Sequence, residues 1–183
     1  MNPGFQYLLN RNIDANDMQK WEIGYCGDGL YSYNFPDDAY KAIVPKFKNS
    51  ILIPVRDIYG EGLGLYARLL NPTEKETKHN GTIWKKSEHL FGLDKAWQSM
   101  LEKGYCYLVE GQFDCMACVK AGYLNTVALL GTAFSETQAC LLSRFVTKVF
   151  VVLDADPAGQ NATVKVINKL KEFNIQGIMV ALS

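Results

Sequence analysis

Apolar segments in the second half of the chain alternate between strand type and helix type. Short apolar runs of the kind that form buried strands occur at residues 105–109, 126–130, 149–153 and 178–182. The stretches between them carry apolar residues at helical spacing, and Ser135 opens a Ser-x-x-Gln capping box that predicts a helix through about residue 145. This alternation predicts an α/β fold in which a mostly parallel sheet is flanked by helices.

The first half of the chain has a different pattern. Two strand candidates, Ile51–Val55 and Leu63–Leu70, flank a polar, glycine-rich segment of the kind that a hairpin needs. Asp14–Trp21 is a short helix candidate. We place the domain boundary near residue 98, so that a smaller mixed α+β subdomain, residues 1–98, precedes the parallel-sheet domain, residues 99–183.

Composition narrows the class of protein. The 183 residues are 48% hydrophobic and 21% charged, which is typical of a folded globular chain. Nineteen basic residues balance nineteen acidic ones, so on net charge alone a nucleic-acid-binding role is not favoured. No apolar run approaches the roughly 18 residues that span a bilayer, and the N-terminus lacks a signal-peptide pattern, so we expect a cytoplasmic protein without a membrane partner. Five irregularly spaced cysteines predict reduced thiols rather than a disulfide framework.

Acidic residues follow two of the predicted strands. Glu110 follows the first strand, with Asp114 four residues later, and Asp154 and Asp156 follow the third. The carboxyl ends of parallel strands meet at one edge of a sheet, where clustered carboxylates are costly without counter-charge. Oxygen ligands without histidine favour Mg²⁺ or Mn²⁺ over zinc, and such ions serve phosphoryl transfer. The alternative is that these acids are solvated residues at helix N-termini.

Three segments that carry these acids resemble the Toprim domain, which DnaG-type primases share with type IA and type II topoisomerases and some nucleases. They are Leu108–Asp114, Leu130–Thr132 and Val152–Gly159, and together they are most similar to the primase branch. The resemblance implies that Glu110, Asp154 and Asp156 are the catalytic residues and bind two or more Mg²⁺ or Mn²⁺ ions. It also implies a supporting metal-binding role for Asp114. Cys115 and Cys118 lack a second ligand pair at zinc-site spacing, so we expect no zinc.

The first half also resembles the primase family, namely the N-terminal subdomain of the DnaG-type RNA-polymerase core. The similar segments are Tyr7–Ile13, Trp21–Tyr25, Ile53–Asp57 and Leu90–Leu93. The resemblance implies that four basic residues bind template and nucleotide phosphates: Arg11, Arg68, Lys78 and Lys86. It implies a nucleotidyltransferase that makes short RNA primers on single-stranded DNA from ribonucleoside triphosphates. It also implies a replicative helicase as a partner, through regions absent from this chain.

The chain departs from the primase pattern at its end. The family has a further Asp-x-Asp segment shortly after the fourth strand, whereas this sequence stops at Ser183, so we expect a C-terminally incomplete Toprim domain. Two other functions stay open at this point: a Toprim-type metal-dependent nuclease, and a non-catalytic module that binds single-stranded nucleic acid. Apart from the four site acids, residues 99–183 carry four more basic than acidic residues. The zero net charge therefore hides a mildly basic surface whose positive charge is balanced by the acids of the predicted site.

Overall fold

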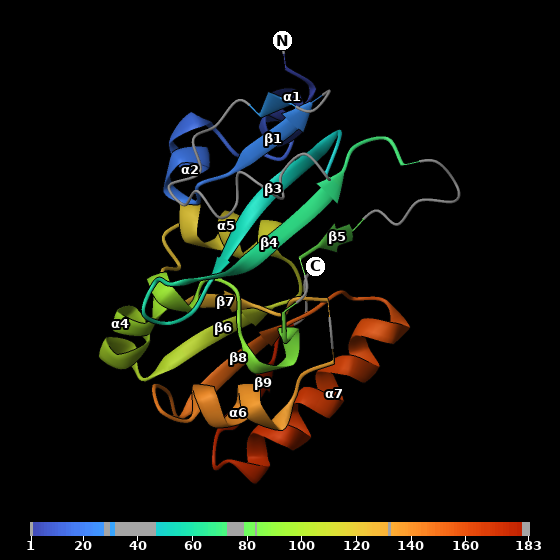
Figure 1. Cartoon of the computed structure of the whole chain (residues 1–183). Coiled ribbons are helices and arrows are strands. Elements are labelled where there is room, and N and C mark those ends of the chain that lie inside the picture. Colours follow the sequence, from blue (N-terminus) through green and yellow to red (C-terminus); the bar gives the residue numbers. More distant parts are fainter. Residues whose placement is uncertain are drawn as a thin grey trace. The chain divides into compact units, whose positions relative to one another are not determined.

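The computed structural model describes residues 2–27, 30–31, 47–72, 79–82, 84–131 and 133–180 (Figure 1). The chain divides into two compact units, one formed by Met1–Val55 with Gly62–Trp84 and the other by Arg56–Glu61 with Lys85–Ser183. Among the helices within the described ranges, none is long and apolar enough to cross a membrane.

The first unit contains an antiparallel sheet with strand order β2-β1-β3-β4-β5. Its strands are β1 (Gly24–Gly27), β2 (Leu30–Tyr31), β3 (Ser50–Arg56), β4 (Gly62–Leu69) and β5 (His79–Gly81). The predicted hairpin is confirmed, because β3 and β4 are neighbours and the turn between them closes with a 2.9 Å hydrogen bond from Asp57 N to Glu61 O. Turn residues 56–61 belong to the second unit, where Ile58 packs against the core.

Two short helices lie in the described part of the first unit, α1 (Pro3–Leu9) and α2 (Ala15–Lys20). The predicted helix at Asp14–Trp21 is confirmed as α2. The Asp14 side chain accepts from the N–H of Asp17, and the Asp17 side chain accepts from the N–H of Asp14, so the two residues cap the first turn reciprocally. Our sequence analysis missed α1, although Asn2 caps it and Pro3 takes the first helical position.

The second unit contains the parallel sheet, with strand order β7-β6-β8-β9 and every neighbouring pair parallel. Its strands are β6 (Tyr105–Val109), β7 (Thr126–Ala128), β8 (Lys148–Val152) and β9 (Gln176–Met179). The helices are the 3-10 helix η2 (Lys86–Glu88), α4 (Leu93–Lys103), α5 (Gln112–Lys120), α6 (Glu136–Leu142) and α7 (Pro157–Glu172). The predicted α/β fold is thus confirmed, although β9 begins two residues earlier than expected.

A large core cluster of the second unit lies on one face of this sheet. Alternate strand residues such as Leu108 and Val151 pack there against residues of α4, α6 and α7. The expected boundary near residue 98 falls inside α4, whereas the contacts change from one unit to the other near residue 85. The physical reason is that the apolar side of α4, including Ala96 and Met100, is buried in this core.

A capping box fixes the start of α6, as predicted. Ser135 Oγ accepts from Gln138 N, and Gln138 Oε1 accepts from Ser135 N, each at 3.0 Å. The Gln138 amide also donates to the carbonyl oxygens of Lys86 and His89, at 3.2 and 2.7 Å. Gln138 therefore ties the backbone of η2, which carries Lys86, to the first turn of α6.

Candidate active site at the carboxyl edge of the parallel sheet

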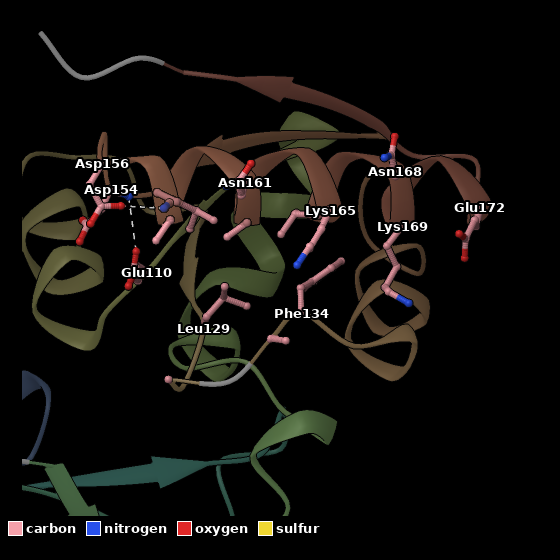
Figure 2. Close-up of a pocket in the computed structure, with 17 residues that line it drawn as sticks. Glu110, Leu129, Phe134, Asp154, Asp156, Asn161, Lys165, Asn168, Lys169 and Glu172 are labelled. Carbon is pink, nitrogen blue, oxygen red and sulfur yellow. Dashed lines mark hydrogen bonds between the residues drawn. The ribbon is translucent and has the colours of Figure 1, made fainter. Parts of the chain in front are cut away.

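Strands β6 and β8 end at the same level, because they pair in parallel with Val109 opposite Val152. Glu110 follows β6 directly, and Asp154 follows β8 after one intervening residue. The backbone N–H of Asp154 donates a long hydrogen bond of 3.4 Å to Glu110 Oε2 (Figure 2). The register of the sheet therefore brings together two acids that lie 44 positions apart in the chain.

Asp156 has a structural role as well as a place in the site, because it is the N-cap of α7. Its Oδ1 accepts from Gly159 N at 2.7 Å, and Pro157 takes the first helical position. A Cβ on Gly159 would collide with the carbonyl oxygen of Asp154, so only glycine lets the helix start this close to the strand end. The Asp-x-Asp-x-x-Gly pattern thus has a local structural basis, and Oδ2 of Asp156 is not used by the cap.

Asp114 lies at the third position of α5 and stabilises the turn that follows Glu110. Its Oδ2 accepts from Gly111 N at 3.0 Å, which satisfies a backbone donor at the helix start. Asp114 also helps to raise the pKa of Cys118, one helical turn on, although burial of the thiol is the larger cause. Among the described residues, Asp114 is not one of those that line the cavity at Glu110.

Glu110, Asp154 and Asp156 open onto one cavity of about 930 Å³. The cavity is bounded by one side of α7, by the segment after β7 and by the ends of β6 and β8. Its apolar lining includes Leu129 and Phe134. All three acids are exposed, so a ligand in this cavity can reach their carboxylates.

The acids that line this cavity can be compared with the ligands that a divalent metal needs. Within the described ranges, no group of three or more His, Cys, Asp or Glu side chains lies close enough together to hold an ion. The acids nevertheless fit the chemistry of Mg²⁺, which is usually bound through one or two carboxylates and keeps several waters. Glu110, Asp154 and Asp156 all line one water-accessible cavity, with the Glu110 carboxylate held by the backbone N–H of Asp154 and one oxygen of Asp156 left over by the helix cap.

Two of the predicted phosphate-binding residues share one site in the first unit. The guanidinium of Arg11 lies 5.0 Å from the centre of the Tyr7 ring, a cation–π distance. Tyr66 is buried on β4, and burial raises its pKa to about 12, while a hydrogen bond with Arg68 and the charges of Arg68 and Arg11 oppose the rise. The structure therefore places both arginines close enough to act on one phenol.

Lys86, a third predicted basic residue, is not part of that group. Lys86 lies in η2 of the second unit, where its backbone is held by Gln138. Lys78 lies outside the described residues.

Our sequence analysis missed the part of the site that α7 contributes. Asn161, Lys165, Asn168 and Lys169 line the same cavity as the acids. Asn161, Lys165 and Lys169 follow one another at intervals of four residues and Asn168 lies three after Lys165, so all four lie along one side of the helix. This signal was legible in the sequence once Asp156 had been recognised as the N-cap.

The fold and the acids define the class of protein. Residues 107–183 match the family model described as Toprim-like. That match covers the whole parallel sheet except the first two residues of β6, and it includes Glu110, Asp154 and Asp156. Residues 107–183 of the second unit therefore form a Toprim domain.

The comparisons with whole chains are more specific. The DNA primase of Aquifex aeolicus is 30% identical over an alignment 191 residues long, and the alignment covers 93% of this chain and 38% of that protein. The crystal structure of the zinc-binding and RNA polymerase domains of the Aquifex aeolicus primase matches with a TM-score of 0.82 and 29% identity, over 97% of this chain and 49% of that one. The RNA polymerase domain of Mycobacterium tuberculosis primase DnaG, in complex with double-stranded DNA, matches with a TM-score of 0.81 and 27% identity, over 99% and 66%.

The chain belongs to the Toprim-domain cores of DnaG-type primases. It spans about a third of the length of the curated relatives that it matches.

Proposed function

We propose that this chain is the catalytic core of a DNA primase, which joins ribonucleotides on a single-stranded DNA template by metal-dependent nucleotidyl transfer. The observation that carries the proposal is the common ending of β6 and β8, which sets Glu110 beside Asp154 at an open cavity. The similarity to DNA primases extends over 93% of the chain, beyond the Toprim domain alone, and supports the polymerase reaction over other Toprim chemistry.

In this proposal Glu110, Asp154 and Asp156 hold Mg²⁺ or Mn²⁺, two ions or more. The metal would neutralise the triphosphate and lower the pKa of the attacking 3′ hydroxyl. The protein's part is to hold the carboxylates in place. The N–H of Asp154 orients the Glu110 carboxylate and the α7 cap holds Asp156. Asp114 maintains the turn after Glu110 and is the supporting acid of the metal site.

The basic residues of both units would bind the phosphates of template and nucleotide. Arg11 is restrained against Tyr7 and Arg68 against Tyr66, so both guanidinium groups lose less conformational entropy when a phosphate binds. Lys86 and Lys78 complete the proposed set. The partners are then single-stranded DNA and ribonucleoside triphosphates, and a replicative helicase that contacts regions outside this chain, in the cytoplasm.

A second candidate is a non-catalytic module that binds single strands. It is favoured by one observation, that the described acids do not form a group of three ready to hold an ion. In that case the acids would be solvated residues at helix starts, as the caps made by Asp156 and Asp114 also allow.

The test compares wild type with the double variant Asp154→Asn, Asp156→Asn, because asparagine caps a helix about as well as aspartate but carries no charge. Both proteins are titrated with Mn²⁺ and incubated with single-stranded template and ribonucleotides. We expect metal binding and oligonucleotide synthesis by the wild type, and loss of both in the variant. Glu102→Gln, which removes an exposed acid on α4, is the matched control and retains both.

Each other outcome has a definite meaning. Equal Mn²⁺ binding by wild type and double variant refutes the metal site. Shortening of the template in place of new oligonucleotides identifies a nuclease. Strand binding that persists in EDTA, without synthesis by the wild type, favours the non-catalytic module.

A further inference from the structure

The cavity at the acids continues along α7 well beyond the proposed metal ligands. Asn161, Lys165, Asn168 and Lys169 line it in succession, as Figure 2 shows with the acids at one end of the row. Along a helix that rises 1.5 Å per residue, Lys165 lies about 14 Å from Asp156, and Lys169 lies about 6 Å further on. The row is therefore longer than the metal site requires.

The polar side chains of this row are available to a ligand. Asn161, Lys165 and Asn168 are exposed, and within the described part of the chain their side chains make no hydrogen bond or ion pair. Lys169 has a loose ion pair, 3.6 Å from the largely exposed Glu136. Exposed pairs of this kind contribute little free energy, so a phosphate can replace the carboxylate as partner of Lys169.

The opposite side of the cavity is apolar. Leu129, Phe134 and Leu153 are buried residues whose surfaces contribute to its lining, and Ala162 and Val166 add apolar surface on the α7 side. A groove with one apolar side and a line of amide and ammonium groups suits an extended chain that carries regularly spaced anions. The separation of two lysines one helical turn apart is closer to the distance between successive phosphates of an extended single strand than to the shorter distance between neighbouring phosphates within one nucleotide.

The geometry points to the α7 groove, lined by Asn161, Lys165, Asn168 and Lys169, as a binding site for the phosphodiester backbone of a single strand that extends away from the acids. This inference rests on the proposed function only for the identity of the strand, which is either the growing RNA or the DNA template. Lys165 and Lys169 each bind a phosphate, and the two asparagine amides hydrogen-bond sugar or phosphate oxygens. Glu172 marks the far end of the groove, because its charge repels phosphate.

The experiment measures binding of fluorescent five-nucleotide RNA and DNA strands, and of a mononucleotide, by anisotropy in EDTA. EDTA separates strand binding from metal binding and chemistry. The variant Lys165→Ala, Lys169→Ala is compared with wild type between 0.05 and 0.2 M salt. Lys171→Ala is the matched control, since Lys171 is an exposed lysine of the last turn of α7 and does not line the groove among the described residues.

Two lost phosphate contacts make the plot of log affinity against log salt less steep by about 1.4, because each contact to a single strand contributes about 0.7. Over the fourfold salt range, wild-type affinity then falls about sevenfold more than that of the double variant. The control keeps the wild-type slope. Glu172→Gln binds the pentanucleotides more tightly than wild type. The strand whose affinity drops more in the double variant is the one that the groove holds.

Several results would overturn the inference. These are a slope unchanged in the double variant, a mononucleotide bound as tightly by wild type as the pentanucleotides, and no pentanucleotide binding by wild type at 0.05 M salt. The two proposals fail separately. If the wild type synthesises oligonucleotides but the salt dependence of affinity is unchanged in the double variant, only the groove inference is refuted. If the salt dependence changes but the wild type synthesises nothing, only the proposed polymerase function is refuted.

Discussion

The two roles of Asp156 can be separated by a pair of substitutions. Asp156→Ala removes both the charge at the site and the acceptor that caps α7, whereas Asp156→Asn removes the charge and keeps an acceptor for Gly159 N. We therefore expect both variants to lose metal-dependent synthesis, and only the alanine variant to lose stability.

The size of the stability effect follows from the cap. Replacing an N-cap aspartate by alanine costs about 1 kcal/mol, and for a chain of this length 1 kcal/mol lowers Tm by about 2–4 °C. The α7 helix has 16 residues, and its Val166 and Leu170 are buried in the core, so a frayed first turn weakens the packing of the whole helix. Asn and Asp rank about equally as caps, so the asparagine variant should stay within a few tenths of a kcal/mol of wild type.

Urea denaturation followed by far-UV circular dichroism measures these differences, with salt at 0.5 M to screen the interaction of Asp156 with the helix dipole. Ser135→Ala, which removes the N-cap of α6, provides a second cap variant of the same expected cost. The reasoning is refuted if Asp156→Ala is as stable as wild type, or if Asp156→Asn is destabilised as much as Asp156→Ala.

Three further predictions concern other residues. Gly159→Ala should lower Mn²⁺ affinity and destabilise the protein by about 1–3 kcal/mol, because the new Cβ collides with the Asp154 carbonyl. Calorimetric titration measures the affinity, and a wild-type value in the variant would contradict this prediction. Tyr66 should ionise near pH 12 in an ultraviolet titration, because burial raises its pKa from 10.0 to about 12. Its contribution to stability is then lost as pH rises from about 10 to about 12, and Tyr66→Phe should remove that loss. Asp114→Asn should lower the pKa of Cys118 and speed its alkylation at pH 8, and an unchanged rate would show that the carboxylate has no influence on the thiol.

Features that depend on neighbouring residues in the chain were predictable. The strand and helix alternation, the short helix at Asp14–Trp21, the cap at Ser135 and the acids after two strands were all read from local patterns. Side-chain periodicity and capping chemistry act over a few residues, so the sequence itself contains the information. The same signals were present for α1, at Asn2 and Pro3, and were overlooked because the helix is short.

Features that depend on distant residues were not predictable in this way. The boundary near residue 98 divided α4, because a sequence pattern does not reveal which core receives the apolar side of a helix. The family resemblance pointed to Arg11 and Arg68 as phosphate-binding residues, but only the structure shows that both act on Tyr66, since no local spacing indicates it. The α7 groove needed the segment after β7 as its other wall.

The sequence by itself determined that this protein has a parallel α/β domain with acids at strand ends, because strand length, helix period and cap residues are local properties. Only the tertiary structure decided that Glu110 meets the backbone of Asp154, that Asp156 both caps α7 and lines the cavity, and that two lysines of α7 line the same cavity. Strand register and helix packing decide these relations, and both result from burial of apolar surface between residues that are far apart in the chain.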